Sequence, residues 1–237
     1  MSSAPFGLWN TCGGTLIAPN VIVTLATCLV KIKSTVADPA IHPSQLSILV
    51  GSERTENSAK NIFKASKFIF YPGYRLEVYR HNIALIVLEK NVPQNLASPI
   101  SLYDQPITDD LKVRAVGWGA TTSNNEKYST NLNYIDLNIS SIGSCGIANS
   151  MWSTNNGMNI CTVNREEKGV CFGDFGGPLV TAETTPAQLV GVIDMIESQN
   201  INENNVKCGT RGALTYHTNV RLYSEWINQN IRENIIA

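Results

Sequence analysis

The sequence predicts an all-β fold closed by a single C-terminal helix. Its hydrophobic runs are short and are bounded by clusters of Gly, Pro, Asn and Ser, a pattern typical of a β-barrel or β-sandwich. Hydrophobic residues make up 43% of the 237 and charged residues 16%, which is ordinary for a packed globular protein. No apolar run approaches the roughly 20 residues that a membrane-spanning helix needs. We therefore expect a chain that folds around β-sheet cores.

Most elements can be placed from these runs. Apolar side chains near the end of the chain recur at helical spacing, which predicts an amphipathic helix over residues 224–234. Two Asn-rich stretches, Thr121–Asn133 and Ser198–Val206, are polar enough to be exposed loops, either as solvated connectors or as a binding surface. The runs expected to form strands are Gly14–Ile17, Val21–Leu25, Gln45–Val50, Phe68–Tyr71, Ile83–Leu88, Val113–Trp118, Tyr134–Ile139, Pro178–Val180 and Gln188–Ile193.

The balance of charge excludes some classes of partner. Eighteen basic and 19 acidic residues give a formal net charge of −1, which offers no field to attract nucleic acid or an anionic membrane. Residues 1–10 lack the charged start and long apolar stretch of a signal peptide, so we expect the chain to begin downstream of any targeting segment. We expect a monomer that finds its partners by shape.

Six cysteines admit 15 pairings, and the residues alone do not choose among them. A zinc site is disfavoured, because the chain has no C-x-x-C spacing and His42, His81 and His217 lie far from the cysteines in sequence. We expect no metal and no other cofactor.

The run Gly173–Val180, which reads GDFGGPLV, resembles the G-D-S-G-G-P loop of chymotrypsin-like (S1) serine proteases. In this resemblance Phe175 stands in place of the nucleophilic serine. A benzyl side chain cannot attack a carbonyl, since nucleophilic catalysis needs a hydroxyl or thiol beside a base.

Two further segments carry the same resemblance. Cys12–Ile17 and Val23–Cys28 resemble the family's C-G-G-S-L-I and L-T-A-A-H-C, with Thr27 in place of the histidine base. Asn82 begins a stretch that resembles D-I-A-L, with an amide in place of the buried carboxylate. Three independent losses predict a catalytically inactive homologue with no catalytic residue.

The resemblance covers nearly the whole chain and implies its fold. It implies a single domain over 1–237 with two six-stranded antiparallel barrels, the first about 1–103 and the second about 104–222, followed by a C-terminal helix about 224–234. The connection between the barrels is expected near Pro99–Pro106.

The resemblance also implies a disulfide pairing. It gives Cys12–Cys28, Cys145–Cys161 and Cys171–Cys208, with no cysteine left over. A fourth bridge common in the family is expected to be absent, because Val113 and Thr181 occupy the two places of its cysteines. Three bridges imply an oxidising compartment, so the protein is expected to be secreted and extracellular.

Remnants of an active site can also be assigned by resemblance. Gly173 and Phe175 stand where the family builds its oxyanion hole from two N–H groups, although glycines in such a tight loop have a structural explanation as well. Asp174 resembles the carboxylate that pairs with a new N-terminal amine in active members. Without that amine it should be solvated or paired with another donor.

The specificity pocket is expected to be occluded. Gly169 falls at its base, so no charged side chain is provided there, and Ile196 replaces a glycine that leaves room at its mouth. Thr215 falls at a second wall position where the family usually has glycine. Ordinary core packing also explains an isoleucine at 196. Asn138-Ile139-Ser140 is an N-glycosylation sequon, so Asn138 is a candidate for glycosylation.

These observations favour a secreted, non-catalytic serine protease homologue that acts by binding proteins. Among inactive homologues the pattern is most similar to the inactivated protease paralogues of parasitic mites, which are related to mite trypsin-like allergens. That resemblance implies interference with host complement through binding of its components. The alternatives are a cofactor of an arthropod immune cascade and a serine endopeptidase with residual activity.

Overall fold

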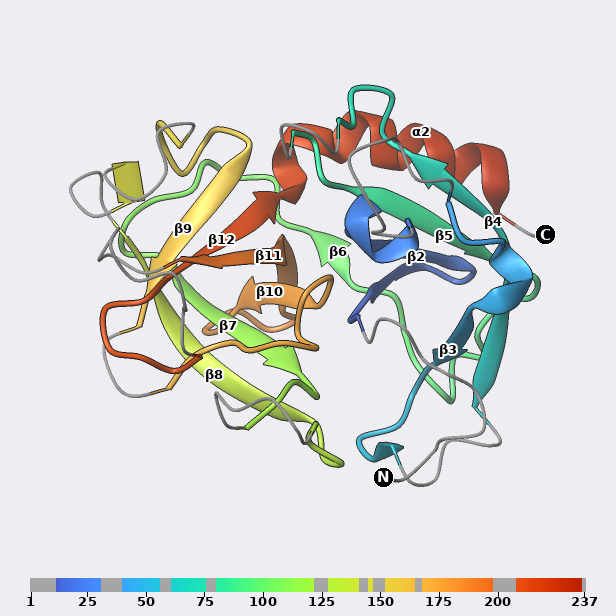
Figure 1. Cartoon of the computed structure of the whole chain (residues 1–237). Helices are drawn as coiled ribbons and strands as arrows, with labels where there is room; N and C mark the ends of the chain where they lie inside the picture. The colour runs from blue at the N-terminus through green and yellow to red at the C-terminus, as the bar shows by residue number, and fades with distance from the viewer. Residues whose placement is uncertain are drawn as a thin grey trace.

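Two antiparallel sheets lie side by side in the computed structural model, and one helix lies along the first of them (Figure 1). The structure describes residues 12–30, 40–55, 61–75, 80–121, 128–140, 145–146, 152–164, 168–197 and 208–235. The predicted Ser198–Val206 loop and residues 122–127 of the other Asn-rich loop lie outside these ranges. Within the described part of the chain, no helix combines the length and apolar character needed to cross a membrane.

The first sheet has the strand order β1-β2-β5-β4-β3. Within the described residues it has five strands, where the family resemblance implies six. Short β-branched and apolar runs form it, and the β2 and β5 strands at its centre are buried on both faces. The strands are β1 (Thr15–Ala18), β2 (Val21–Thr24), β3 (Ser47–Leu49), β4 (Ile62–Phe70) and β5 (Ala84–Leu88).

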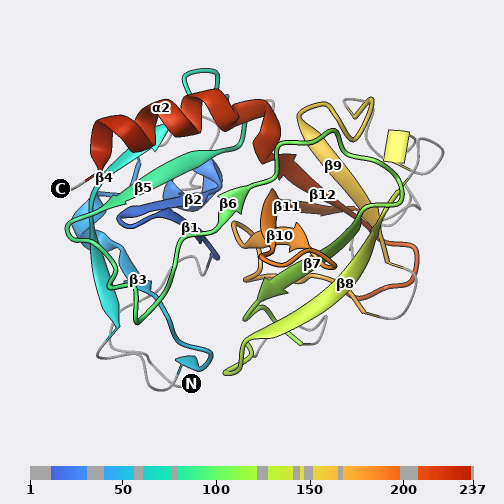
Figure 2. The ribbon, with the colours of Figure 1, turned by 180° about the vertical axis from the view of Figure 1, so that it is seen from behind.

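The second sheet has the order β10-β7-β8-β9-β12-β11-β6, and a further pairing of β10 with β11 closes six of its strands into a barrel. The short β6 strand runs parallel to β11 beside that ring and leads from the first half into the second (Figure 2). The strands are β6 (Ser101–Leu102), β7 (Lys112–Gly117), β8 (Asn133–Ile139), β9 (Asn159–Val163), β10 (Pro178–Thr181), β11 (Gln188–Glu197) and β12 (Leu214–Asn219).

The expected all-β, two-barrel fold is confirmed, but three strands were not predicted, namely the two-residue β6 strand, β9 and β12. The β9 and β12 strands pair with each other inside the second barrel, and all six residues of β12 are buried. Their sequences, NICTV and LTYHTN, interrupt the apolar pattern with Thr, His and Asn. Polar side chains in a buried strand hide it from a search for hydrophobic runs.

Helical turns connect and close the barrels. The α2 helix spans Ser224–Asn234, the predicted range, and follows the 3-10 turn η5 (Val220–Tyr223). The other described turns are η1 (Ala26–Leu29), which follows β2, and η2 (Pro43–Gln45). Figures 1 and 2 both place α2 beside β4 and β5, so the end of the chain returns from the second barrel to cover the first.

One hydrophobic cluster joins the two barrels and the helix. It includes Val23 and Leu85 of the first sheet, Val192 of the second and Ile227 of α2, all almost fully buried. Two other clusters fill the barrels themselves. The relative position of the barrels is therefore set by a shared core.

The three disulfides pair as predicted: Cys12–Cys28, Cys145–Cys161 and Cys171–Cys208. Val113 of β7 and Thr181 of β10, the two places assigned to a missing bridge, are cross-strand partners. A cross-strand pair brings two side chains close enough for direct contact.

We predict that the double variant Val113→Cys/Thr181→Cys forms a fourth disulfide. Closing a loop of about 70 residues contributes about 4 kcal/mol to the free energy of unfolding. Thr181 Oγ1 accepts a hydrogen bond from the Gln188 amide at 2.9 Å, and losing that bond costs about 1 kcal/mol.

The expected result is a bridged peptide in a non-reducing map and a net gain of about 3 kcal/mol in urea unfolding. Each single variant serves as a control and should be slightly destabilised. Two free thiols in the folded double variant would contradict the prediction.

Candidate functional site

Thr27 and Asn82 meet at the junction between the barrels. Thr27 lies in η1, directly after β2, and Asn82 lies two residues before β5. The Thr27 amide donates to Asn82 Oδ1 at 2.9 Å, and Asn82 Nδ2 donates to Thr27 Oγ1 at 3.1 Å. Asn82 is buried, with 3% of its surface exposed. The two side chains are thus tied to each other.

Phe175 lies beside this pair, in the loop between Cys171 and β10. Its carbonyl oxygen accepts a hydrogen bond from the Gly13 amide at 2.8 Å and lies 3.9 Å from Cys28 Sγ. Its ring packs edge-to-face on Phe172, with ring centroids 6.0 Å apart. The structure therefore brings the three positions singled out from sequence to one place. None of the three side chains is a base that can activate a hydroxyl.

The loop around Phe175 contains a glycine in a left-handed conformation. Gly173 adopts a φ of 93°, and a Cβ atom there would lie 2.6 Å from the Tyr128 ring. Within the described residues, neither the Gly173 nor the Phe175 amide donates to a protein acceptor. Glycine is required here by conformation and space, so both explanations of the loop remain open.

The sequence analysis did not identify Asp194 as a hydrogen-bond partner of Asn82. Asn82 Nδ2 also donates to Asp194 Oδ1 at 2.7 Å, and the Thr218 hydroxyl lies 2.8 Å from Asp194 Oδ2. Asp194 sits at a β-bulge. Ile193 pairs with His217 and Met195 pairs with the adjacent residue Tyr216, so Asp194 has no partner of its own in the register of β12. A bulge re-aims a side chain, and no motif in the sequence indicates this one.

Asp194 is a buried carboxylate whose hydrogen-bond partners Thr218, Asn82 and Asn159 are all neutral side chains. Burial raises the pKa of Asp194 to about 6, although hydrogen bonds from Thr218, Asn82 and Asn159 lower it in part. The carboxylate at the barrel junction therefore belongs to Asp194, and Asn82, which stands in place of the family's carboxylate, donates a hydrogen bond to it.

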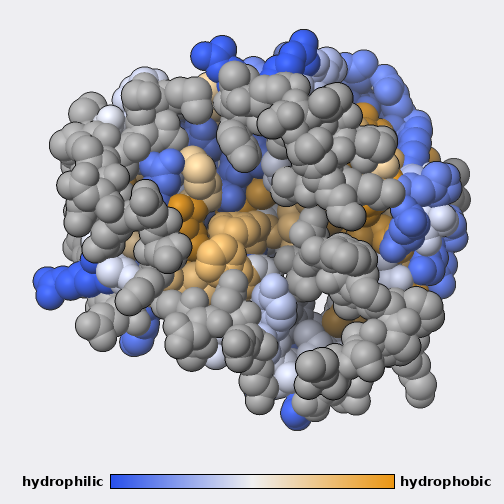
Figure 3. Space-filling model, in the orientation of Figure 1, coloured by the Kyte–Doolittle hydropathy of each residue, from blue (hydrophilic) through white to orange (hydrophobic). Residues whose placement is uncertain are grey.

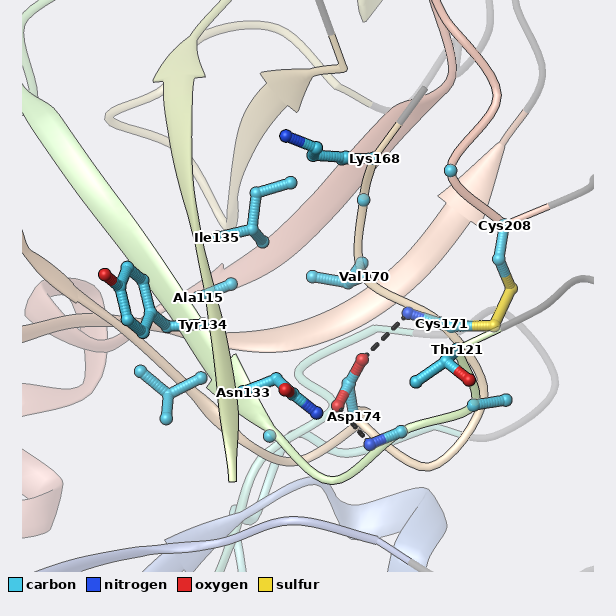
Figure 4. Close-up of a pocket in the computed structure, with 16 residues that line it drawn as sticks. Ala115, Thr121, Asn133, Tyr134, Ile135, Lys168, Val170, Cys171, Asp174 and Cys208 are labelled. Atoms are coloured by element: carbon cyan, nitrogen blue, oxygen red, sulfur yellow. Dashed lines mark hydrogen bonds between the residues drawn. A yellow bond between two sulfur atoms is a disulfide. The ribbon is translucent and has the colours of Figure 1, made fainter. Parts of the chain in front are cut away.

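Asp174 is paired with another donor, as one of its two expected arrangements requires. Its carboxylate accepts hydrogen bonds from the Gly119 amide at 2.7 Å and the Cys171 amide at 2.9 Å. It lines a cavity of about 350 Å³, in which Lys168 points away from it (Figure 4). Burial raises the pKa of Asp174, while the two backbone hydrogen bonds oppose that rise.

The positions assigned to the specificity pocket also come together. Ile196 of β11 and Thr215 of β12 are direct cross-strand partners, and Ile196 packs against the core of the second barrel. A Cβ atom on Gly169 would lie 2.2 Å from Asn164 Nδ2, so the Asn164 side chain occupies the space beside Gly169. Asn164 carries no pattern that identifies it in the sequence.

Buried polar atoms near this pocket lack partners. His217 Nε2 and Thr162 Oγ1 lie 2.9 Å apart in a hydrogen bond, while His217 Nδ1 and Thr215 Oγ1 have no partner among the residues that the structure describes. Burial lowers the pKa of His217 to about 3, so the ring is neutral at neutral pH. Orphaned buried polar groups cost free energy, and this interior is less stable than an apolar one.

The surface around the site is partly apolar. Tyr128 and Phe172 are 45% and 39% exposed, and hydrophobic surface gathers near the centre of the face shown in Figure 3. Asn138 lies on β8 opposite Lys112 and is half-buried, while Ser140 of its sequon is buried. Glycosylation of Asn138 stays a prediction.

No group of three or more His, Cys, Asp or Glu within the described ranges is arranged to hold a metal ion.

Comparisons with known proteins identify relatives along most of the chain. A family model described as Trypsin matches residues 4–227. A CLIP domain-containing serine protease B4 from Anopheles gambiae is 26% identical over 93% of this chain and 62% of its own length. Hypodermin-B from Hypoderma lineatum is 26% identical over 95% of this chain and 80% of its own length.

Two further comparisons extend this picture. Mannan-binding lectin serine protease 1 of the mouse is 25% identical over 92% of this chain, which spans only 31% of that protein. The solved structure of neuropsin, a serine protease of mouse brain, superposes with a TM-score of 0.74 at 23% identity, covering 93% of this chain and 89% of that one.

We predict that Thr215→Val stabilises the protein. Valine fills the same space without the orphaned hydroxyl, so the free energy of unfolding should rise by about 1 kcal/mol in urea titrations. The matched control is Thr162→Val, which removes the partner of His217 and should lower stability by about 1–3 kcal/mol. Equal destabilisation by both variants would contradict the assignment.

Proposed function

The chain belongs to the trypsin-like S1 serine protease family, and from that membership we propose that it is a secreted, non-catalytic homologue that acts by binding other proteins. The observation that carries the proposal is the replacement of the nucleophile by Phe175 in an otherwise family-like loop. Its carbonyl keeps the contact with Gly13 while its side chain offers no group for covalent catalysis.

The neighbouring positions support the same proposal. Catalysis by this family needs a base that takes a proton from the nucleophile and a carboxylate that orients the base. Thr27 and Asn82 offer a hydroxyl and an amide, and their hydrogen bonds satisfy each other. Neither takes up a proton at neutral pH.

The pocket residues argue against substrate binding as well. Ile196 and Thr215 add neighbouring side chains on the adjacent strands β11 and β12, and Asn164 fills the space beside Gly169. Gly169 also lines the cavity of about 350 Å³, so the space that remains there is narrowed on one side by Asn164. A narrowed pocket together with the substituted triad favours a binding role over a cleavage role.

The disulfides support secretion. Three bridges staple the chain, and such bridges form and persist in oxidising compartments. A disulfide-stapled scaffold presents loops to partners outside the cell.

We assign host complement components as the partners, on the resemblance to the inactivated protease paralogues of parasitic mites. The exposed Tyr128 and Phe172, on either side of Gly173, add aromatic surface next to the former active site. The second candidate is a cofactor role in an arthropod immune cascade, which the similarity to the mosquito CLIP domain-containing protease favours. Capture from serum and from haemolymph, followed by mass spectrometry, separates the two.

We predict that the protein turns over no peptide ester or amide and is not labelled by fluorophosphonates. Phe175→Ser alone should stay at background, because a serine without a base is not activated. Restoring the triad with Thr27→His, Asn82→Asp and Phe175→Ser should still give poor activity. Ile196 narrows the pocket, and the Asn82→Asp carboxylate would face Asp194 where the present contact is 2.7 Å.

The control for this experiment is the same triple variant with Ile196→Gly and Asp194→Ser, which removes both obstacles. Robust cleavage by the single Phe175→Ser variant would refute the non-catalytic proposal and favour the residual endopeptidase.

We predict that the binding activity is insensitive to active-site inhibitors and resides on loops outside the former cleft. Complement lysis of sensitised red cells should fall with increasing protein. Asn131→Lys, at an exposed position of the Thr121–Asn133 loop, should weaken the effect several-fold. Changes in the Ser198–Val206 loop should act in the same way.

Phe175→Ala and the exposed Lys67→Ala serve as controls and should leave inhibition unchanged. Unchanged lysis at micromolar protein would reject the complement role. Loss of inhibition in Phe175→Ala alone would place the binding site in the former pocket.

A further inference from the structure

Asp194 joins the two barrels through side chains from both. It belongs to β11 of the second barrel, and it accepts from Asn82 of the first barrel. Thr218 of β12 contacts both residues, because its hydroxyl lies 2.8 Å from Asp194 Oδ2 and 3.2 Å from the Asn82 carbonyl oxygen. We propose that Asp194 and Thr218 form a proton-dependent latch between the barrels, which tightens when Asp194 takes up a proton.

A threonine hydroxyl has one hydrogen to donate. With Asp194 ionised, both neighbours of the Thr218 hydroxyl are acceptors, so only one of the two contacts is a hydrogen bond at any moment. When the hydrogen points to Asp194, the Asn82 carbonyl loses its link to the second barrel.

One added proton removes this conflict. Protonation of Asp194 at Oδ2 gives that oxygen a hydrogen, which it donates to Thr218 Oγ1. The Thr218 hydrogen is then free for the Asn82 carbonyl, and Asn82 Nδ2 continues to donate to Asp194 Oδ1. The protonated state thus has one more hydrogen bond across the junction than the ionised state, while the hydrogen bonds that Asn82 and Asn159 donate to Asp194 are weaker without the negative charge.

Burial shifts the protonation of Asp194 to mildly acidic pH. Burial raises the pKa of Asp194 from its ordinary 3.8 to about 6. The other titratable groups packed around it are Tyr223 of η5, whose pKa is raised by burial, and His81, which bonds to the Tyr223 hydroxyl at 3.1 Å. Tyr71 packs against His81, Arg80 and Arg75 lower the pKa of His81, and His217 is the cross-strand partner of Ile193, the residue before Asp194.

The sign of the effect distinguishes Asp194 from the histidines. Its folded-state pKa lies above the unfolded value, so its contribution to stability is full below pH 3.8 and is lost as the pH rises through about 6. Burial lowers the pKa of His81 and of His217, so each contributes stability that is lost as the pH falls below 6.5. A comparison of variants is needed to separate these opposite effects.

The test compares the unfolding equilibrium constants of the wild type and Asp194→Asn from pH 7.5 to pH 5. The amide of Asp194→Asn donates to Thr218 at every pH, while the histidine effects are common to both proteins. The ratio of the wild-type constant to that of Asp194→Asn should therefore fall about tenfold over this range. The matched control is Asp136→Asn, since pairing with Arg114 lowers the pKa of Asp136 and its ratio should not change.

Amide hydrogen exchange then shows whether the change reaches the first barrel. After correction for intrinsic exchange, protection of peptides containing Thr27 and Asn82 should rise between pH 7.5 and pH 5 in the wild type, and not in Asp194→Asn. If Asp194→Asn does not fold, Asp194→Ser replaces it, because its hydroxyl also lacks titration in this range. His81→Asn, which suits the left-handed φ of 54°, repeats the comparison without the nearby histidine.

A constant ratio, or a protection change confined to the second barrel, would overturn the latch.

Discussion

The two barrels meet at a close backbone approach within their shared core, where the Gly13 amide donates to the Phe175 carbonyl, and the rest of the structure depends on this junction. A Cβ atom on Gly13 would lie 2.6 Å from Gly177, and one on Gly176 would lie 2.5 Å from the Gly13 oxygen. This junction is made by backbone atoms, so it does not need a catalytic side chain at 175. The family architecture can therefore persist after the nucleophile is lost.

Around that junction, polar side chains have been rearranged rather than removed. Asn82 donates to Thr27 and Asp194 and accepts from the Thr27 amide, so its buried amide is fully engaged. Hydrogen bonding is less complete around the pocket, since Thr215 Oγ1 and His217 Nδ1 are buried without a partner among the described residues. Stability at this interior is lower than an apolar core would provide. The hydrogen bond between Asn82 and Asp194 links the two barrels across this interior.

Much of the fold could be predicted from local patterns. Short apolar runs located nine strand segments, the helical period located α2, and the family resemblance paired the cysteines. The β6 strand was missed because it has only two residues, and β9 and β12 were missed because Thr, His and Asn interrupt their apolar pattern. Thr162 and His217, which are hydrogen-bonded across the sheet, are an example. Burial of polar residues depends on partners 55 residues away, which no local pattern records.

The sequence by itself determined which chemistry is absent at three positions, since Thr27, Asn82 and Phe175 are readable by their motifs. Only the tertiary structure decided what stands there instead. The bulge at Asp194 turns a carboxylate toward Asn82, which lies 112 residues earlier in the chain, and Asn164 fills the space beside Gly169. Such contacts depend on strand register and on the approach of two barrels, and these are set by packing across the whole chain rather than by neighbouring residues.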